Sequence, residues 1–368
     1  MNKTLIRTIS IKLDRGEHEA TLHATQQAFN AAASWIATVC WQEHITNTNT
    51  AHHRVYGETR RRFGLGAQLA VCARAKAVES IKATKTQQSE TCPQFGERGS
   101  LRYDARTYRL LSLDRVSLNT LQGRIVCRLI LGTRQHEMLV DSTWKIGGAD
   151  LVWRRGIYYL NVTQCKEAPD LTETNETLGI DLGMVKLATD STGESFSGIK
   201  VHEVRLRYQK RRQILQSVGT RSAKRRLKKM SGREKRFQKN TNHGISKTLV
   251  QKAVHTRKAL ALEDLTGIRA RVTVRRANRS ERHSWAFYQL RIFLAYKAAW
   301  AGVPLRFVDP RNTSRTCSQC GHCEKANRHS QSSFTCQQCG FCLNADYNAA
   351  INISRAVVKQ PLVAARQG

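Results

Sequence analysis

Hydrophobic positions along the chain switch between the alternating spacing of strands and the three-to-four spacing of helices. Residues 8–13 alternate between apolar and polar side chains, which predicts a half-buried strand. Apolar residues recur at helical spacing in residues 17–41 and 71–81, which predicts two amphipathic helices. Strand patterns return in residues 124–131 and 151–162. The first part of the chain is therefore predicted to be a β unit interrupted by a helical insertion.

The second half is predicted to contain short strands separated by helices. The run 151–162 carries the turn signal Arg154-Arg155-Gly156 and predicts a hairpin, and the polar stretch 166–176 after it is the expected domain boundary. Further strands are predicted in residues 178–183, 185–189, 258–264 and 304–308, and further helices in residues 245–255 and 285–302. This order indicates an α/β multidomain protein.

Composition points to a polyanionic partner. The 368 residues include 61 Lys and Arg against 28 Asp and Glu, a formal net charge of +33. A chain with this imbalance repels itself unless a polyanion such as nucleic acid neutralises it. A solvated basic surface, or a ribosomal-type binder without chemistry, is the alternative that charge alone leaves open. The hydrophobic fraction of 40% and six Trp favour a globular protein over a basic tail.

Sixteen Lys and Arg residues lie between Lys200 and Lys239, with only Glu203 and Glu234 against them. Apolar residues at helical spacing predict a helix whose polar sides are densely cationic. A solvated helix is possible, but such density is self-repulsive unless phosphates meet it. We therefore expect nucleic-acid contact here, with five candidate residues: Arg205, Arg212, Lys224, Arg225 and Lys228.

Two Cys-x-x-Cys pairs near the C-terminus predict a structural zinc site. The pairs are Cys317 with Cys320 and Cys336 with Cys339, and a glycine follows each pair. Two thiolates on each of two tight turns can close a tetrahedron around one Zn²⁺. A third cysteine extends each pair, and two histidines lie close by, so other ligand sets stay open: Cys323, Cys342, His322 and His329.

The N-terminal residues and the other five cysteines indicate an intracellular protein. Residues 1–13 mix apolar residues with three cations, which predicts no signal peptide, and no apolar stretch is long enough to span a bilayer. The remaining cysteines are scattered singly, as expected of reduced thiols in a cytosolic core.

Three carboxylates stand where predicted elements begin or end: Asp181, Glu263 and Asp346. If they converge, their mutual repulsion is relieved by two Mg²⁺ or Mn²⁺ ions, which prefer oxygen ligands and support phosphodiester hydrolysis. Singly, each acid could instead be a turn or helix-end residue or a solvated strand end. Asp264 competes with Glu263, but neighbouring strand residues point to opposite faces, so only one can face the site.

These residues belong to four motifs that resemble, in order and spacing, the transposon-encoded TnpB (OrfB) family, regarded as the ancestor of the type V CRISPR (Cas12) nucleases. The motifs lie between residues 179 and 353: Gly179-Ile-Asp181-Leu-Gly183, Leu262-Glu263-Asp264-Leu265, the run from Asp309 to Gly321, and the run from Asp346 to Ile353. The residues Asn344-Ala345 before the last acid depart from the family, where many relatives carry further charge.

The resemblance implies an RNase H-like RuvC nuclease domain in residues 176–310 and 344–368, with a zinc ribbon that binds target nucleic acid inserted in residues 311–343. It implies a wedge-like β-barrel in residues 1–15 and 96–170 and a helical recognition insertion in residues 16–95. It selects Glu263 over Asp264, assigns the three acids to two divalent ions, and leaves Cys323 and Cys342 outside the zinc site.

The resemblance further implies an RNA-guided DNA endonuclease. Such a protein binds an RNA from the transposon end, recognises a short target-adjacent motif in double-stranded DNA and cuts at one RuvC site. It holds the RNA–DNA heteroduplex by its backbone while base pairing carries the sequence information. We expect a monomer with its guide RNA in a prokaryotic cytoplasm, associated with the nucleoid and not with a membrane.

Three other functions compete with this interpretation. An RNA-guided DNA-binding protein without cleavage would be expected to have alanine at the acidic positions, and the sequence has none. A DDE-type transposase orders its acids Asp, Asp, Glu, whereas this chain has Asp, Glu, Asp. A basic zinc-ribbon RNA-binding protein leaves the three acidic motifs unexplained.

Overall fold

The computed structural model describes residues 4–14, 16–264, 287–330 and 332–356. The chain divides into two compact units, Met1–Glu167 and Ala168–Gly368. Within the described ranges, none of the helices combines the length and hydrophobicity needed to cross a bilayer.

The first unit is built on a seven-stranded antiparallel sheet in the order β2-β6-β7-β1-β5-β4-β3. Its strands are β1 (Thr4–Asp14), β2 (Leu101–Tyr103), β3 (Tyr108–Leu110), β4 (Arg115–Thr120), β5 (Gly123–Ile130), β6 (Lys145–Arg154) and β7 (Ile157–Glu167). The hydroxyl of Tyr108 on edge strand β3 donates to the carbonyl of Gly147 on β6 at 2.5 Å, so the sheet curls towards closure.

The strand predictions for this unit are confirmed. Burial along β1 alternates, with Ile9, Ile11 and Leu13 in the core, as the hydrophobic pattern required. The predicted hairpin joins β6 to β7, where Arg155 and Gly156 both adopt positive φ.

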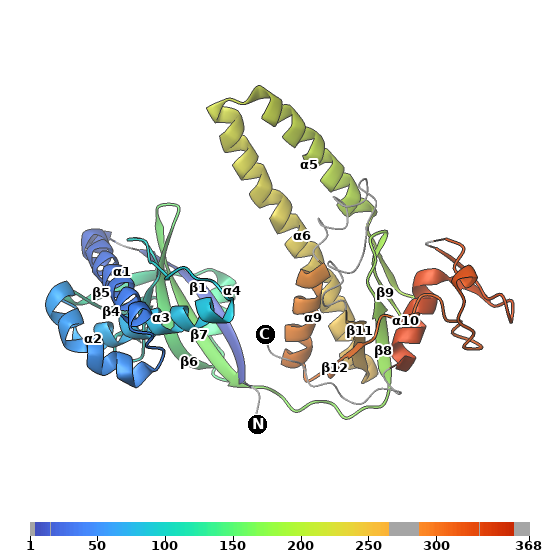
Figure 1. Cartoon of the computed structure of the whole chain (residues 1–368), viewed down its shortest axis with the longest axis horizontal. Coiled ribbons are helices and arrows are strands. Elements are labelled where there is room, and N and C mark those ends of the chain that lie inside the picture. The colour runs from blue at the N-terminus through green and yellow to red at the C-terminus, as the bar shows by residue number, and fades with distance from the viewer. Residues whose placement is uncertain (1–3, 15, 265–286, 331, 357–368) are drawn as a thin grey trace. The chain divides into compact units, whose positions relative to one another are not determined.

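Three helices pack together beside the sheet of the first unit (Figure 1). They are α1 (Glu19–Gln42), α2 (Thr48–Phe63) and α3 (Ala67–Thr86), and a short helix, α4 (Thr133–Val140), follows β5. Helices α1 and α3 contact the strands of the sheet, and α2 packs on α1 and α3. The helices predicted in residues 17–41 and 71–81 correspond to α1 and α3. The sequence pattern missed α2, because only Ala51, Val55 and Thr59 of its sixteen residues are buried.

The second unit contains a five-stranded sheet in the order β10-β9-β8-β11-β12. Its strands are β8 (Thr177–Asp181), β9 (Lys186–Asp190), β10 (Ser195–Ser197), β11 (Ala259–Glu263) and β12 (Leu305–Val308). β8, β9 and β10 form an antiparallel meander, whereas β11 runs parallel to both β8 and β12. The four strands predicted in this half are thus present, and β10, which was not predicted, joins them in the same sheet.

Helices α5 (Ile199–Val218) and α6 (Arg221–Thr256) form a long hairpin that projects from this sheet in Figure 1. The prediction of a separate helix in residues 245–255 is wrong, because α6 continues unbroken through the cationic segment to Thr256. The lower part of α6 packs against α9 (Phe287–Trp300) over the sheet.

The remaining elements form the cysteine-rich segment, residues 311–343, and the helix that follows it. Two short strands, β13 (Ser333–Thr335) and β14 (Cys342–Asn344), pair antiparallel, and a 3₁₀ turn, η2 (Lys325–Asn327), precedes them. Helix α10 (Ala345–Ala356) begins directly after β14 and packs on β8 and β11.

Candidate metal centres

Two of the three predicted acids terminate neighbouring parallel strands. Asp181 is the last residue of β8 and Glu263 is the last residue of β11. Leu262 pairs with Ile180, so the same register places Glu263 beside Asp181. Parallel strands lie about 4.8 Å apart, and the two side chains therefore leave the same edge of the sheet.

The third acid, Asp346, comes from the first turn of α10 and is 8% exposed. Its helix lies unusually close to β8, because a β carbon built on Gly179 would fall 2.2 Å from the carbonyl oxygen of Ala350. Gly179 is thus required for α10 to lie flat on β8. That close approach brings Asp346 to the edge of the sheet where Asp181 and Glu263 lie.

Burial raises the pKa values of all three acids, and the charges of the other two raise that of Asp181 further. The pKa of Asp181 rises to about 7, first through burial and then through the charges of Glu263 and Asp346. Burial also raises the pKa values of Glu263 and Asp346. Glu263 and Asp346 thus both lie within electrostatic reach of Asp181, and a cation bound beside these acids would relieve the repulsion.

Two contacts to these acids were not predicted from the sequence. The hydroxyl of Thr313 donates to Oε1 of Glu263, and Nη2 of Arg328 lies 3.4 Å from Oδ1 of Asp346. The charge of Arg328 lowers the pKa values of all three acids, partly offsetting their burial. Thr313 lies within the motif that runs from Asp309 to Gly321, whereas nothing in the sequence distinguished Arg328 from the other Lys and Arg residues.

The neighbouring acid Asp264 has a different partner. Its Oδ1 accepts a hydrogen bond from Nη1 of Arg291 on α9 at 2.9 Å, and its side chain is 48% exposed. Asp264 therefore lies against α9, while Glu263 lies against Thr313.

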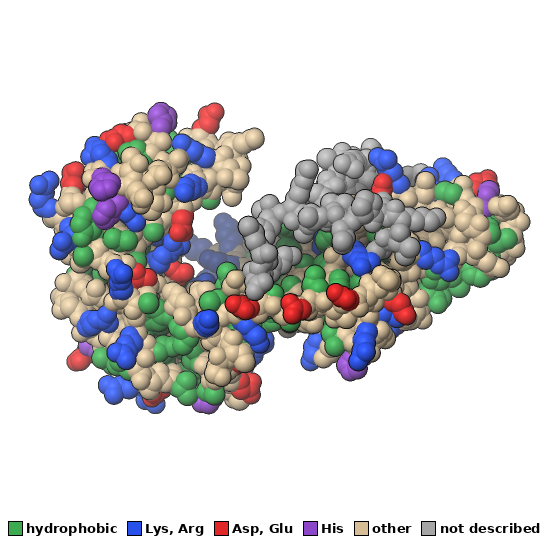
Figure 2. Space-filling view, turned by 90° about the horizontal axis from the view of Figure 1, so that it is seen from below, with side chains coloured by type: hydrophobic (Ala, Val, Ile, Leu, Met, Phe, Trp, Pro, Cys, Tyr) green, Lys and Arg blue, Asp and Glu red, His purple; other side chains and the backbone are tan. Residues whose placement is uncertain are grey.

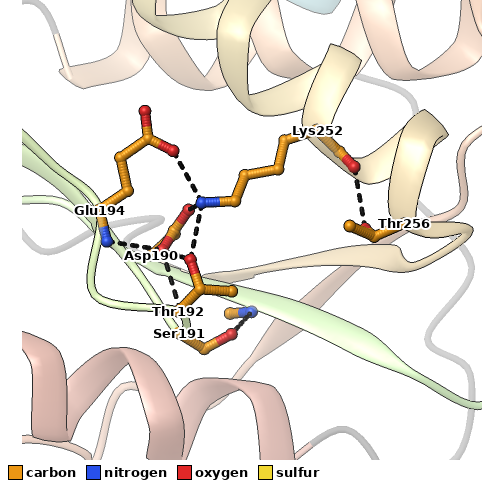
Figure 3. Close-up of polar contacts among 7 residues, drawn as sticks. Asp190, Ser191, Thr192, Glu194, Lys252 and Thr256 are labelled. Carbon is orange, nitrogen blue, oxygen red and sulfur yellow. Dashed lines mark hydrogen bonds and ion pairs between the residues drawn. The ribbon is translucent and has the colours of Figure 1, made fainter.

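An ion-pair network around one buried carboxylate fixes the turn between β9 and β10 to α6 (Figure 3). Nζ of Lys252 lies 2.5 Å from Oδ2 of Asp190, 2.6 Å from the hydroxyl of Thr192 and 2.7 Å from Oε2 of Glu194. Asp190 is fully buried, and its Oδ1 accepts hydrogen bonds from the backbone N–H groups of Thr192 and Glu194. Lys252 thereby supplies the charge that a buried carboxylate needs.

This turn lies next to the strand that carries Asp181. Asp190 pairs with Ile180 across β8 and β9, and Asp181 pairs with Thr189. Ser191 exchanges hydrogen bonds with the backbone of Gly179. The network of Lys252 thus supports the strand end from which Asp181 projects.

The four cysteines of the outer pairs converge on one point. The sulfur atoms of Cys317, Cys320, Cys336 and Cys339 all lie within 4.8 Å of one another, and this group could hold a metal ion. Burial opposes ionisation of Cys336, but hydrogen bonds from the backbone N–H groups of Cys339 and Gln338, together with the thiols of Cys320 and Cys339, lower the pKa of that thiol to about 6. Such hydrogen bonds favour the thiolate that a metal ligand requires.

The additional cysteines and histidines have other contacts. Cys342 is exposed at the start of β14, and Cys323 is exposed and lies on a bridge to Thr316. His322 lies 3.2 Å from Glu324, and His329 lies 3.5 Å from the amide of Gln337. Within the described part of the chain, the metal-competent group contains none of these four residues.

The predicted nucleic-acid residues are divided between two environments. Lys224, Arg225 and Lys228 of α6 are exposed, whereas Arg205 and Arg212 of α5 are partly buried. Arg212 forms an ion pair with Glu234 across the hairpin. Its positive charge is therefore already partly neutralised within the protein.

A cavity of about 590 Å³ opens between α5 and α6. Five Lys or Arg side chains, including Arg225, surround the apolar side chains of Ile214, Leu215 and Met230. On the face shown in Figure 2, Lys and Arg side chains are dispersed among acidic and hydrophobic ones. The densest run of cations in the sequence lies on this hairpin.

Two family models match the chain from the end of the first unit to helix α10. Residues 160–267 match the OrfB_IS605 model, described as a probable transposase, and residues 287–353 match the model of the Cas12f1-like TNB domain. The resemblance to the TnpB (OrfB) family is confirmed. The two matched ranges contain the three acids and the four cysteines.

Curated relatives of the TnpB and Cas12f type are similar to this chain over part of its length. A CRISPR-associated endodeoxyribonuclease Cas12f1 from Sulfoacidibacillus thermotolerans is 32% identical over 59% of this chain and 55% of its own length. A putative RNA-guided DNA endonuclease InsQ from Escherichia coli K12 is 30% identical over 55% of this chain and 54% of its own. The chain spans about half the length of these relatives.

Solved Cas12-type structures share the fold. A Cas12f1–sgRNA–target DNA complex superposes with a TM-score of 0.67 at 16% identity, covering 92% of this chain and 85% of that one. The mini-RNA-guided endonuclease CRISPR-Cas_phi3 superposes with a TM-score of 0.58 at 11% identity, covering 98% and 93%. The chain therefore has the fold of Cas12-type effectors.

Proposed function

We propose that the chain is an RNA-guided, metal-dependent DNA endonuclease of the TnpB type. The observation that carries the proposal is the gathering of Asp181, Glu263 and Asp346 at one edge of a sheet, with the pKa of Asp181 raised to about 7. A buried group of like charges is costly as a structural device but is suited to binding divalent cations. Relatives named as RNA-guided DNA endonucleases support the substrate class.

The second unit would be the nuclease domain, of the RNase H-like RuvC type. An antiparallel meander extended on one side by two parallel strands supports this assignment. The domain would take residues 176–310 and 344–368, with the zinc ribbon in residues 311–343. Of this range, residues 265–286, 331 and 357–368 lie outside the described residues.

In the first unit, residues 1–15 and 96–170 would form the wedge-like barrel, and residues 16–95 the recognition insertion. The seven-stranded sheet and the three helices between β1 and β2 support this division. Residues 1–3 and 15 lie outside the described residues.

The donor sets fit two kinds of metal. The carboxylates of Asp181, Glu263 and Asp346 offer the hard oxygen ligands that Mg²⁺ or Mn²⁺ prefers, whereas the four cysteine sulfurs suit one structural Zn²⁺. Two bound divalent ions would activate water and stabilise the attacking and leaving oxygens of a phosphodiester. Thr313 would orient Glu263, and Arg328 would neutralise part of the charge beside Asp346.

Guide RNA and double-stranded target DNA would be the partners. The exposed cations Lys224, Arg225 and Lys228 would contact phosphates, with Arg205 and Arg212 nearby on α5. Contact with the backbone alone suffices, because pairing with the guide reads the sequence. We expect one protein per RNA, in a prokaryotic cytoplasm near the nucleoid.

Two adjacent acids provide a matched test. Glu263→Gln should abolish cleavage of a target plasmid while leaving RNA and target binding unchanged, because it removes a metal ligand without altering shape. Asp264→Asn should retain cleavage, because Asp264 pairs with Arg291 instead. Plasmid cleavage and filter binding are measured on the same complexes. Equal cleavage by both variants would refute the assignment, and target binding without cleavage by the unsubstituted chain would favour an RNA-guided binding protein.

A further inference from the structure

Helix α10 holds the first cysteine turn through a buried amide. Asn348 is fully buried, two residues after Asp346. Its Oδ1 accepts a hydrogen bond from the backbone N–H of Ser318 at 3.0 Å, and its Nδ2 donates to the carbonyl of Thr316 at 2.8 Å. These two backbone groups flank Cys317, so both polar ends of one side chain are committed to the backbone around a candidate zinc ligand.

Two further side chains on the same helix extend this contact. Nδ2 of Asn352 donates to the carbonyls of Thr313 at 2.8 Å and Thr316 at 2.6 Å, and Arg355 donates to the carbonyl of Ser318. The spacing of four and then three residues places these side chains and Asn348 along one helix face. The contact is therefore a continuous row of side-chain to backbone hydrogen bonds.

The cysteine-rich segment also touches the acids directly. Thr313, held by Asn352, donates to Glu263, and Arg328 contacts Asp346. The residue before Arg328 is Asn327, which is fully buried. Its Nδ2 donates to the carbonyl of Arg315 at 2.9 Å, and its Oδ1 accepts from the backbone N–H of Gln337, between the second pair of cysteines, at 2.9 Å.

We infer that the four-cysteine ribbon, in residues 311–343, positions the three acids through its contact with Asn348. Zinc bound in the ribbon would thereby strengthen divalent-ion binding by the acids. This inference rests on the proposed function. Four thiol groups this close depend on a metal to stay together, so zinc loss releases the cysteine turns. The supports of Glu263 and Asp346 are then lost, and the carboxylates no longer share one geometry.

The test measures Mn²⁺ binding and zinc content on the full chain. Electron paramagnetic resonance of free Mn²⁺ gives the affinity at neutral pH, and atomic emission gives the zinc content. Binding lost in Asp181→Asn is assigned to the acids. Asn348→Ala should retain its zinc, because all four cysteines remain, and should weaken this Mn²⁺ binding by about tenfold, the size of effect seen when metal ligands lose the groups that orient them.

Two variants and one treatment calibrate the result. Asn348→Asp keeps the acceptor for Ser318 but buries a negative charge against the carbonyl of Thr316, so it should lose at least as much Mn²⁺ affinity as Asn348→Ala. Asn242→Ala removes an equally buried amide from α6, away from the ribbon, and should leave Mn²⁺ affinity unchanged. Stripping zinc from the unsubstituted chain should weaken Mn²⁺ binding at least as much as Asn348→Ala.

The possible outcomes distinguish a failure of this inference from a failure of the proposed function. Unchanged Mn²⁺ affinity in zinc-loaded Asn348→Ala, or in the zinc-stripped chain, overturns the coupling and leaves the endonuclease proposal intact. Absence of any acid-dependent Mn²⁺ binding in the unsubstituted chain overturns both. If Asn348→Ala loses its zinc, Asn352→Ala replaces it as the milder variant and is judged by the same criterion.

Discussion

Lys76 of α3 has a charged group in a partly buried position. Its Nζ donates to Oδ1 of Asn30 at 2.8 Å and to the carbonyl of Ser100 at 2.5 Å, and it lies 4.6 Å from the centre of the Phe95 ring. Burial lowers the pKa of Lys76 from 10.5 to about 8. Within the first unit, this ammonium group holds the chain before β2 against α1 and α3.

The lowered pKa predicts a pH dependence of stability. Between pH 8 and 10.5 the unfolded chain holds the proton that folded Lys76 has lost, so the free energy of unfolding rises with pH in that window. Lys76→Met should remove this rise, as measured by urea unfolding of both proteins at several pH values. Lys82→Met, an exposed lysine on the same helix, serves as the control. Parallel curves for the original chain and Lys76→Met would contradict the prediction.

The sequence indicated which residues carry chemistry but not what surrounds them. Acids at strand ends and paired cysteines form local patterns. The structure brings the four cysteines to one point and places Glu263 and Asp346 within electrostatic reach of Asp181. Thr313, Arg328 and Asn348 act through contacts with distant segments, which depend on how the ribbon packs on α10. With 61 Lys and Arg residues, no local pattern separates Arg328 from the rest.

At the scale of elements, the close contact between β8 and α10 can be tested at Gly179. An added β carbon would meet the backbone of Ala350, which cannot move without shifting the helix that carries Asp346. Gly179→Ala should therefore destabilise the second unit by about 1–3 kcal/mol, as overpacking does, and should reduce cleavage further through displacement of Asp346. Thermal unfolding and plasmid cleavage measure the two effects.

A second glycine provides the control for that substitution. Gly57 lies in α2, and a β carbon there meets nothing within 4 Å. Gly57→Ala should stabilise the helix by about 0.5–1 kcal/mol and leave cleavage unchanged. A Gly179→Ala protein as stable and active as the original chain would show that α10 can move away from β8 without consequence.

The link between α6 and the β9–β10 turn supports a further prediction. Lys252→Met leaves Asp190 buried without its cation, so the second unit should lose up to about 3 kcal/mol of stability. Lys258→Met breaks a pair with the exposed Glu176 and should cost less than about 1 kcal/mol. Differential scanning calorimetry of the two variants tests the contrast, and equal losses would argue against a role for the buried pair.

The length of α6 shows where pattern analysis failed at this scale. The first half of α6 has few buried residues. The spacing of hydrophobic residues therefore could not predict that one helix continues through the cationic segment. The break between α5 and α6 is marked in the sequence by Gly219 and Thr220. Gly219 takes a left-handed conformation at the end of α5, and the hydroxyl of Thr220 caps the start of α6. The core strands were predictable because their burial is regular.

At the scale of the whole molecule, the net charge of +33 should govern the affinity for nucleic acid. Phosphate contacts release counterions, so a protein with 6–10 such contacts loses about 10³ to 10⁵ in affinity between 50 and 200 mM salt. We expect a loss in this range for the RNA that co-purifies with the expressed chain. The logarithm of the binding constant should fall linearly with the logarithm of salt concentration.

The contribution of the hairpin can be separated from that of the total charge. Replacing Lys224, Arg225 and Lys228 by glutamine should reduce the slope of that salt dependence by about two to three units, because each lost phosphate contact removes nearly one. Filter binding across a salt series measures the slope. The three residues are exposed, so the substitutions should leave folding intact.

A control variant that loses three positive charges from the first unit shows whether the change in salt dependence is specific to the hairpin. Arg109, Arg115 and Arg128 are exposed on β3, β4 and β5 of the first unit. Arg115 and Arg128 face each other across two strands, so replacing them also removes a repulsion. If the hairpin binds phosphates directly, the hairpin variant changes the slope more than the sheet variant does. Equal changes would mean that both surfaces bind RNA, and an unchanged slope in the hairpin variant would exclude α6 from the interface.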